Sequence, residues 1–191
     1  TELANDAGME VLTGKRDFAR VRQELAAAGY KGETVALMVA TDTHYRRAMG
    51  DVGADMMKSV GMTVDYQAVD WGTAVIRREN KGPVDKGGWS GLYTTLSGLD
   101  LQVPSGHAFR TTGETGWFGW ANSPRIAALR NEWLDAADIP TQKRIAVEIQ
   151  RQWWIDVPHI PIGQWLQPTA WRDDMTGMVE GFPIFWNLRR A

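Results

Sequence analysis

The stretch MTVDYQAVDWGTAVIRREN, residues 62–80, predicts a strand that leads directly into a helix. Between Met62 and Ala68, apolar and polar residues alternate, which is the pattern of a strand with one solvent-facing side. Asp70 then stands where a helix N-cap is expected, and the residues after it predict a short helix. A strand and a helix thus follow one another near the middle of the chain.

The residues before this stretch predict the same kinds of element. Segment 17–29 has the apolar spacing of a capped helix, and TVALMV, residues 34–39, predicts a buried strand. A second helix starts at Asp42 or Thr43 and stops at Gly61. We expect its apolar stripe to face the core, at Tyr45, Met49, Val52, Met56 and Val60. The order helix, strand, helix, strand, helix predicts an α/β layer.

Beyond this layer the periodicity is lost and then returns. Residues 81–122 contain nine of the twenty glycines and predict a long loop, a feature that in compact domains is usually functional or mobile. Two helices are expected within 122–137 and 140–158. Their apolar faces are expected at Ile126, Leu129, Trp133, Ile145, Ile149 and Trp153. Segments 159–171 and 180–190 have the pattern of extended chain.

The composition excludes several classes of protein. Twenty-one basic and twenty-three acidic residues give a net charge of −2, so the chain lacks the basic field that attracts nucleic acid. No apolar run is long enough to span a bilayer, and no cysteine is present for a disulfide or a thiolate. Because Thr1 is not an initiator methionine, we expect the chain to be a processed or truncated piece.

The chain carries none of the catalytic motifs that we sought. The G-x-S-x-G, H-E-x-x-H and dinucleotide glycine patterns are absent, and the three histidines lie far apart in sequence. Asp70 is most simply a helix cap, and Glu132 and Glu148 are most simply solvated. We therefore expect no catalytic residue, no metal site and no cofactor. A carbohydrate-active hydrolase that uses an Asp/Glu pair stays open as the alternative, and a structural interaction domain as a third reading.

The positive signal is the placing of aromatic residues beside flexible backbone. Ten tryptophans occur in the chain; Trp71 opens a predicted helix and Trp89 lies within GGWSGLYTTLSGLD, residues 87–100. Indole rings offer stacking area, and neighbouring glycines let a ligand approach the main chain closely. Trp117 and Trp120 are weaker candidates of the same kind. This arrangement favours a module that binds a small molecule.

Several stretches together resemble family 5 solute-binding proteins, the dipeptide and oligopeptide receptors of bacterial ABC transporters. The resemblance is carried by RVRQELAAAGYKGETVALMV, by ADMMKSVGMTVDYQAVDWGTAVIRREN, by GGWSG, and by the two helices from Asn122 to Pro158. It covers nearly the whole chain. It implies a periplasmic-binding-protein-like fold of the second type, with residues 1–191 as the C-terminal lobe and 161–191 returning toward a first lobe.

The resemblance also implies partners and a compartment. It implies a periplasmic protein, monomeric when intact and not itself membrane-spanning, that binds a peptide or peptide-like solute. A permease in the inner membrane would receive the solute. It implies no nucleic-acid partner, no enzymatic activity and no cofactor.

Site residues follow from matching this sequence to the family pattern, which has an acidic residue before a tryptophan and an arginine seven residues later. Here these are Asp70, Trp71 and Arg78. Gly-Trp then precedes an aspartate that holds the peptide's amino group, but here that position is Leu92. The implied ligand-binding residues are Trp71, Arg78, Gly88, Trp89, Ser90, Leu92 and Tyr93. Either another carboxylate such as Asp100 replaces the aspartate, or the ligand lacks a free amino terminus there.

Overall fold

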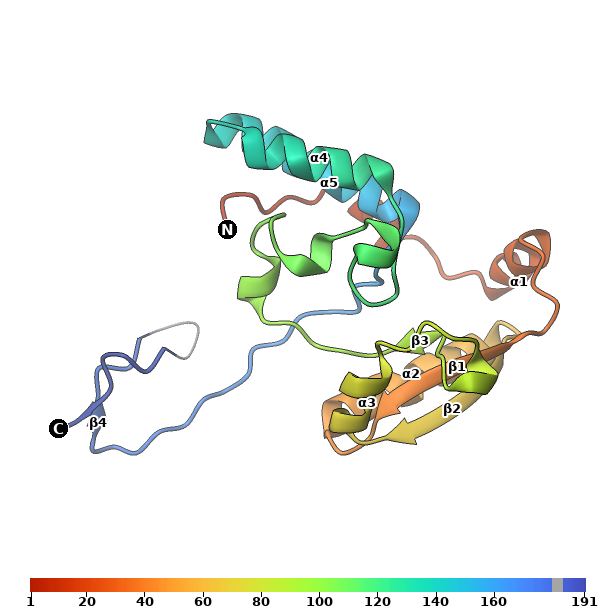
Figure 1. Ribbon diagram of the computed structural model, residues 1–191, viewed down its shortest axis with the longest axis horizontal. Helices are drawn as coiled ribbons and strands as arrows, with labels where there is room; N and C mark the ends of the chain where they lie inside the picture. The colour runs from red at the N-terminus through yellow and green to blue at the C-terminus, as the bar shows by residue number, and fades with distance from the viewer. Residues whose placement is uncertain (180–183) are drawn as a thin grey trace. The chain divides into compact units, whose positions relative to one another are not determined.

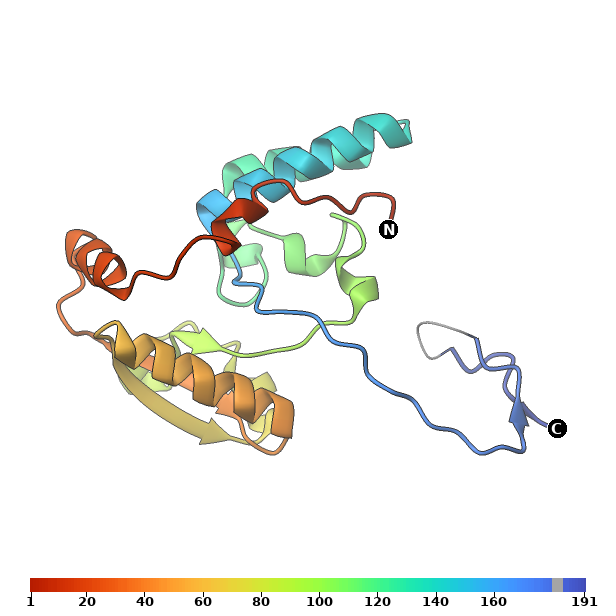
Figure 2. The same cartoon turned by 180° about the vertical axis from the view of Figure 1, so that it is seen from behind.

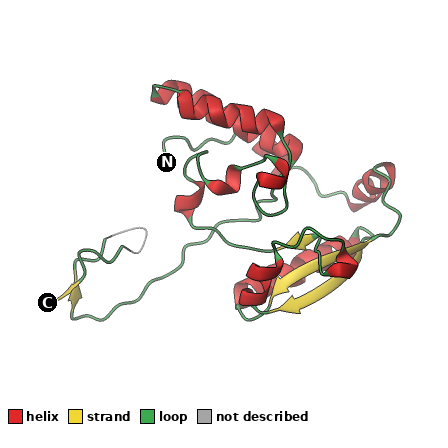
Figure 3. Cartoon of the chain, viewed as in Figure 1, coloured by secondary structure: helices red, strands yellow, loops and turns green. Residues whose placement is uncertain are grey.

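The computed structural model describes residues 1–179 and 184–191 of the chain. Contacts divide these residues into two compact units, 1–158 and 159–191, and each is described by itself. Figure 1 traces the chain with its elements labelled, and Figure 3 colours the same view by secondary structure.

The first unit contains a parallel sheet of three strands. The strands are β1 (Thr34–Ala40), β2 (Thr63–Val69) and β3 (Gly91–Leu92), in the order β2-β1-β3. Thr34 lies opposite Thr63 at one end of the β1–β2 ladder, and β3 pairs with the middle of β1 through Leu37 and Met38. The predicted strands and α/β layer are confirmed; β3 lies inside the stretch that was predicted as loop.

One helix covers each face of this sheet, as Figures 1 and 2 show from opposite sides. Helix α2 (His44–Ser59) contacts the face with Leu37 and Val39, and α3 (Trp71–Arg77) contacts the face with Met38 and Ala40. Because successive side chains of a strand point to opposite faces, β1 is buried on both sides. Burial on both faces explains why the apolar residues of β1 form a continuous run in the sequence.

The predicted apolar stripe of α2 is wrong in part. Val60 is buried, but Val52 is 71% exposed and Met56 is 53% exposed. The helix instead approaches the sheet through small residues, Gly50, Gly53 and Ala54. A Cβ at Gly50 would overlap the Val39 side chain of β1, so this close approach requires glycine. Apolar spacing alone missed the contact because the residues that make it have almost no side chain.

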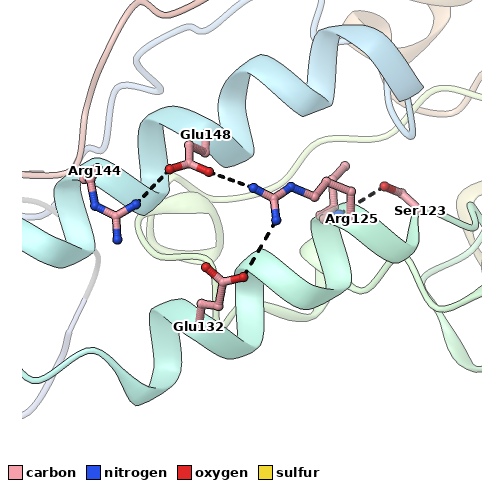
Figure 4. A network of polar contacts seen from close by, with 6 residues as sticks. Ser123, Arg125, Glu132, Arg144 and Glu148 are labelled. Atoms are coloured by element: carbon pink, nitrogen blue, oxygen red, sulfur yellow. Dashed lines mark hydrogen bonds and ion pairs between the residues drawn. The ribbon is translucent and has the colours of Figure 1, made fainter.

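Two further helices form a third apolar cluster, separate from those on the two faces of the sheet. Helices α4 (Pro124–Asp135) and α5 (Ile139–Asp156) pack together, and the cluster contains four of the expected core residues: Leu129, Trp133, Ile145 and Ile149. The Ser123 hydroxyl accepts a hydrogen bond from the Ile126 N–H, which caps α4. On the outer side, Arg125 bridges Glu132 and Glu148, as Figure 4 shows. These ion pairs are exposed and contribute little to stability.

The rest of the first unit is short or irregular. Helix α1 (Phe18–Ala27) is capped by Asp17 as expected, but it buries no residue. Five 3-10 helices complete the unit: Met9–Leu12, Val84–Lys86, Gly98–Leu101, His107–Phe109 and Gly113–Thr115. Four of them lie within the predicted loop 81–122, so that segment is built from tight turns.

The second unit contains one small antiparallel pair. Strands β4 (Met175–Thr176) and β5 (Arg189–Arg190) pair with each other. Segment 159–171 has no regular secondary structure, and most of its side chains are exposed. The predicted extended segment 180–190 is described only in part, since residues 180–183 lie outside the described residues.

Tyr66 gives the sheet a testable pH dependence. Its hydroxyl donates to Asp51 on α2 at 2.7 Å, and desolvation together with this carboxylate raises the pKa of Tyr66 from 10.0 to about 12. A raised pKa in the folded state stabilises the protein below pH 10, and this contribution disappears as the pH rises toward 12. We expect Tyr66→Phe to lose less stability than the wild type between pH 10 and 12 in urea unfolding. An equal loss in both proteins would contradict this.

Candidate functional site

The carboxyl ends of the three parallel strands meet at one edge of the sheet. Strand β1 is central, and the chain leaves β1 and β2 through helices on opposite faces. In open α/β sheets this arrangement is a topological switch point, where ligands commonly bind. Asp42 follows β1, Trp71 follows β2, and Thr95 follows β3. We call the site formed by these three residues and Arg46 of α2 the carboxyl-edge site.

Arg46 is held at the centre of this site by three segments. Its Nη1 donates to the Thr43 hydroxyl at 3.1 Å and its Nη2 to the Thr95 hydroxyl at 3.4 Å. The guanidinium carbon lies 3.9 Å from the centre of the Trp71 ring, in cation–π geometry. Within the described residues no carboxylate lies within ion-pair distance of Arg46, and its buried Nε has no hydrogen-bond partner.

The two carboxylates of the edge are engaged with main chain. Asp42 accepts the N–H of Trp71 at 3.1 Å, and Asp70 accepts the N–H and the hydroxyl of Thr73. The hydrogen bonds from Thr73 lower the pKa of Asp70. Asp70 is thus the helix cap that the sequence predicts. Both carboxylates accept main-chain N–H groups of the first turn of α3, which begins at Trp71.

Trp71, Trp89 and Leu92 share the apolar face beneath α3. All three pack on the buried cluster of Met38, Ala40 and Ala74, and Leu92 is also paired with Met38 in the ladder. The surroundings of Leu92 are therefore apolar. Asp100, the carboxylate considered as a replacement, accepts hydrogen bonds from the N–H and hydroxyl of Ser97 in a capping box.

Trp89 also contacts Arg78 at the carboxyl end of α3 and Trp120 in segment 117–120. The Trp89 indole N–H donates to the Arg78 carbonyl at 3.2 Å, and its ring centre lies 5.7 Å from that of Trp120. The Arg78 guanidinium carbon lies 4.0 Å from the centre of the Phe118 ring. Lys81 donates to the Glu114 carbonyl at 2.9 Å. These contacts hold the glycine-rich segment 113–120 against the end of α3.

Arg77 fixes the main chain directly before Trp89. Its guanidinium donates to the carbonyls of Gly87 and Gly88 at 2.7 and 3.1 Å, and also to the Gln67 side chain of β2. Gly88 is buried, and a Cβ there would overlap the carbonyl oxygen of Gly82. Gly88 is thus a turn residue that sets the position of Trp89.

Ser90 and Tyr93 contact other parts of the sheet. The Ser90 N–H donates to the Ala36 carbonyl, and its hydroxyl accepts from the Ala36 N–H, so Ser90 extends the pairing of β3 with β1. Tyr93 packs on the α2 face against the cluster that contains Ala54. A Cβ at Gly53 would overlap the Tyr93 hydroxyl, and burial raises the pKa of Tyr93.

The structure places the predicted residues on both faces of the sheet: Trp71, Trp89 and Leu92 pack on the cluster of Met38, Ala40 and Ala74, whereas Tyr93 packs on the α2 face. Trp71 is the first residue of α3, and the Trp89 indole donates to the carbonyl of Arg78 at the other end of that helix. Arg46 was not among the residues that the sequence predicted, although its place three residues into the helix after a buried strand was a usable signal.

The described residues contain no group of three or more histidines or carboxylates that could hold a metal ion. None of their helices has the length and apolarity needed to cross a membrane.

One curated relative shares clear sequence identity with the chain. It is a "Probable peptide ABC transporter periplasmic-binding protein" of Sinorhizobium fredii, 32% identical over 177 residues. The match includes 92% of this chain but 33% of the relative. No family model matches the chain.

Solved structures match the fold at lower identity. A dipeptide-binding protein of Pseudoalteromonas sp. SM9913, in complex with Met-Leu, matches with a TM-score of 0.64 at 16% identity over 92% of this chain and 36% of its own. NikA of Staphylococcus aureus, in complex with Ni(L-His)2, matches with a TM-score of 0.60 at 17% identity over 75% and 30%. The chain spans about a third of the length of these proteins and has the fold of that part, as predicted.

Proposed function

Because the chain belongs to the family 5 solute-binding proteins and spans about a third of such a receptor, we propose that it forms most of the second lobe of a periplasmic receptor for an ABC importer. The receptor binds a peptide or peptide-like solute and delivers it to a permease of the inner membrane. It does so without chemical conversion of the solute. Residues 161–191, which lie within the separate unit 159–191, would return toward the first lobe in the intact receptor.

The observation that carries this proposal is the carboxyl edge of the sheet, where the half-buried Trp71 ring and Arg46 guanidinium lie against each other. A solute held between two lobes needs such a surface on each lobe, and the closed form is favoured only by contacts with both. Trp71, Trp89 and Leu92 contact the solute and Arg78 meets an acidic group of it, with Gly88, Ser90 and Tyr93 supporting the segments that carry them. Affinity therefore requires the intact receptor.

The alternative of a hydrolase finds little support at this edge. Asp42 and Asp70 both accept main-chain hydrogen bonds that hold the start of α3, which leaves them poorly placed for proton transfer to a substrate.

The test compares binding with turnover in the intact protein. We expect a solute that copurifies with it to bind saturably at one molecule per receptor and to be recovered unchanged. Trp71→Ala should weaken this binding by about 1 to 3 kcal/mol, the range for a stacked aromatic anchor. Repeated turnover of a substrate, abolished by Asp70→Asn, would instead establish an enzyme.

A further inference from the structure

Val157, the residue that follows α5, has a strained main-chain conformation. Its φ of 45° and ψ of 53° lie in the left-handed region. Side chains branched at Cβ rarely adopt this region, and a residue before a proline, here Pro158, is normally extended. Outliers of this kind persist only where the surrounding structure holds them, and they cluster at ligand clamps and switch regions. The conformation of Val157 therefore requires a restraint.

The restraint lies at the residue directly before Val157, whose own side chain is 49% exposed and packs little. The Asp156 carboxylate accepts a hydrogen bond from the Ser123 hydroxyl, which is the N-cap group of α4. Ser123 is buried and exchanges two hydrogen bonds with the buried Thr111, at 2.9 and 3.2 Å. The charge of Asp156 is thus held at the amino end of α4, where the helix dipole favours it. We call Thr111, Ser123 and Asp156 the Ser–Asp latch.

The last turns of α5 are also tied to the amino-terminal segment. The Gln150 side chain donates to the carbonyls of Asn5 and Ala7 at 2.9 and 3.1 Å. The Trp154 indole N–H donates to the Ala7 carbonyl at 3.2 Å. The chain that follows α5 differs, because segment 159–171 has no regular secondary structure and belongs to the other unit. A fixed helix end followed by irregular chain is where a hinge is expected.

We propose that the Ser–Asp latch holds Val157 in its left-handed conformation and so sets the hinge through which the two lobes of the receptor close on the solute. While the latch is made, the chain leaves α5 with one defined backbone geometry. When the latch is broken, Val157 relaxes toward extended backbone, and fewer receptors have the hinge conformation that closure needs. The apparent affinity falls with that fraction. The inference rests on the proposed function, since it names a device that regulates closure of the same receptor.

The first test measures solute affinity in the intact receptor. The probe is a mixed dipeptide library, and native mass spectrometry measures its binding. Asp156→Ala removes the latch and should weaken binding by at least about fivefold. Adding Val157→Gly to this variant should restore the affinity to within about twofold of the wild type, because glycine adopts the left-handed region without strain.

A second carboxylate of α5 provides the matched control. Asp138 caps the opposite end of the helix by accepting the N–H and the hydroxyl of Thr141. Asp138→Ala removes a cap and leaves the latch in place, so it should change the affinity by less than about twofold. A loss that comes only from weakening α5 would appear in both alanine variants.

Hydrogen exchange at residue 157 tests the latch without any solute. The Val157 N–H donates to the Trp153 carbonyl at 2.9 Å and closes the last turn of α5. We expect this amide to exchange at least about tenfold faster in Asp156→Ala, and near the wild-type rate once Val157→Gly is added, after correction for the intrinsic rate of each residue.

Three results would overturn the inference: wild-type affinity in Asp156→Ala, a loss that Val157→Gly fails to restore, or an equal loss in Asp138→Ala. A wild-type receptor that binds no member of the library would overturn the proposed function, and with it the role of the latch in closure. The two failures are distinct, because exchange at residue 157 reports on the latch when no solute is present.

Discussion

Gly88→Ala should destabilise the protein by about 3 kcal/mol or more, the scale of a steric clash with fixed backbone. The added Cβ would overlap the carbonyl oxygen of Gly82 and also press on that of Pro83, whose carbonyl already accepts the Gly88 N–H. Neither oxygen can move as a flexible side chain would. Relief requires the turn to open, which breaks the hydrogen bonds from Arg77 to Gly87 and Gly88.

A matched glycine provides the control. A Cβ at Gly98, in the same long segment, would have no atom within 4 Å, and its φ is not in the left-handed region. Gly98→Ala should therefore change the free energy of unfolding by less than about 0.5 kcal/mol. The free energy of unfolding of both variants is measured by urea unfolding, followed by far-UV circular dichroism. Equal stability of the two variants would show that the turn accommodates a side chain at Gly88.

The sequence predicts those parts of the fold whose signals are local. Asp17 and Asp70 cap their helices as expected, and Ile126, Leu129 and Ile145 are buried as their spacing predicts. Cap geometry and helical period involve residues close in sequence, so they can be seen without tertiary structure.

The misses depend on contacts between distant segments. The burial of α2 was assigned to its large side chains, whereas the helix meets the sheet through Gly50, Gly53 and Ala54. Strand β3 has two residues, and its existence depends on pairing with Leu37 and Met38 some fifty residues earlier. Local periodicity carries no information about either contact.

The candidate site shows the same limit. Trp71 was found because an aromatic residue at a helix start is conspicuous, and Trp89, found in the glycine-rich stretch, packs on the same apolar cluster as Trp71. Arg46 was missed because its importance comes from what surrounds it: Thr95 from the end of β3, and Trp71 from the end of β2. Only the parallel order of the strands brings these residues to one edge.

Leu92→Asp should destabilise the protein by about 2 to 3 kcal/mol at pH 7, because it replaces a packed apolar side chain with a carboxylate beside Met38, Ala40 and Ala74. The apolar surroundings would raise the pKa of the new carboxyl in the folded state. The charge penalty is therefore present above the unfolded value and is lost as the pH falls below it. We expect the stability deficit relative to wild type to shrink as the pH is lowered from 7 toward 4.

Two controls separate charge from shape in this experiment. The Asn side chain of Leu92→Asn is similar in size to Asp but does not titrate. The stability deficit of Leu92→Asn relative to wild type should therefore not depend on pH in this range. Leu99→Asp places the same carboxylate at a side chain that is 54% exposed, where a change of less than about 0.5 kcal/mol is expected. If Leu92→Asp instead proves as stable as Leu99→Asp at pH 7, a cation must reach position 92. Arg46 would then be the first residue to test, by combining Leu92→Asp with Arg46→Met, since its guanidinium has no other carboxylate among the described residues.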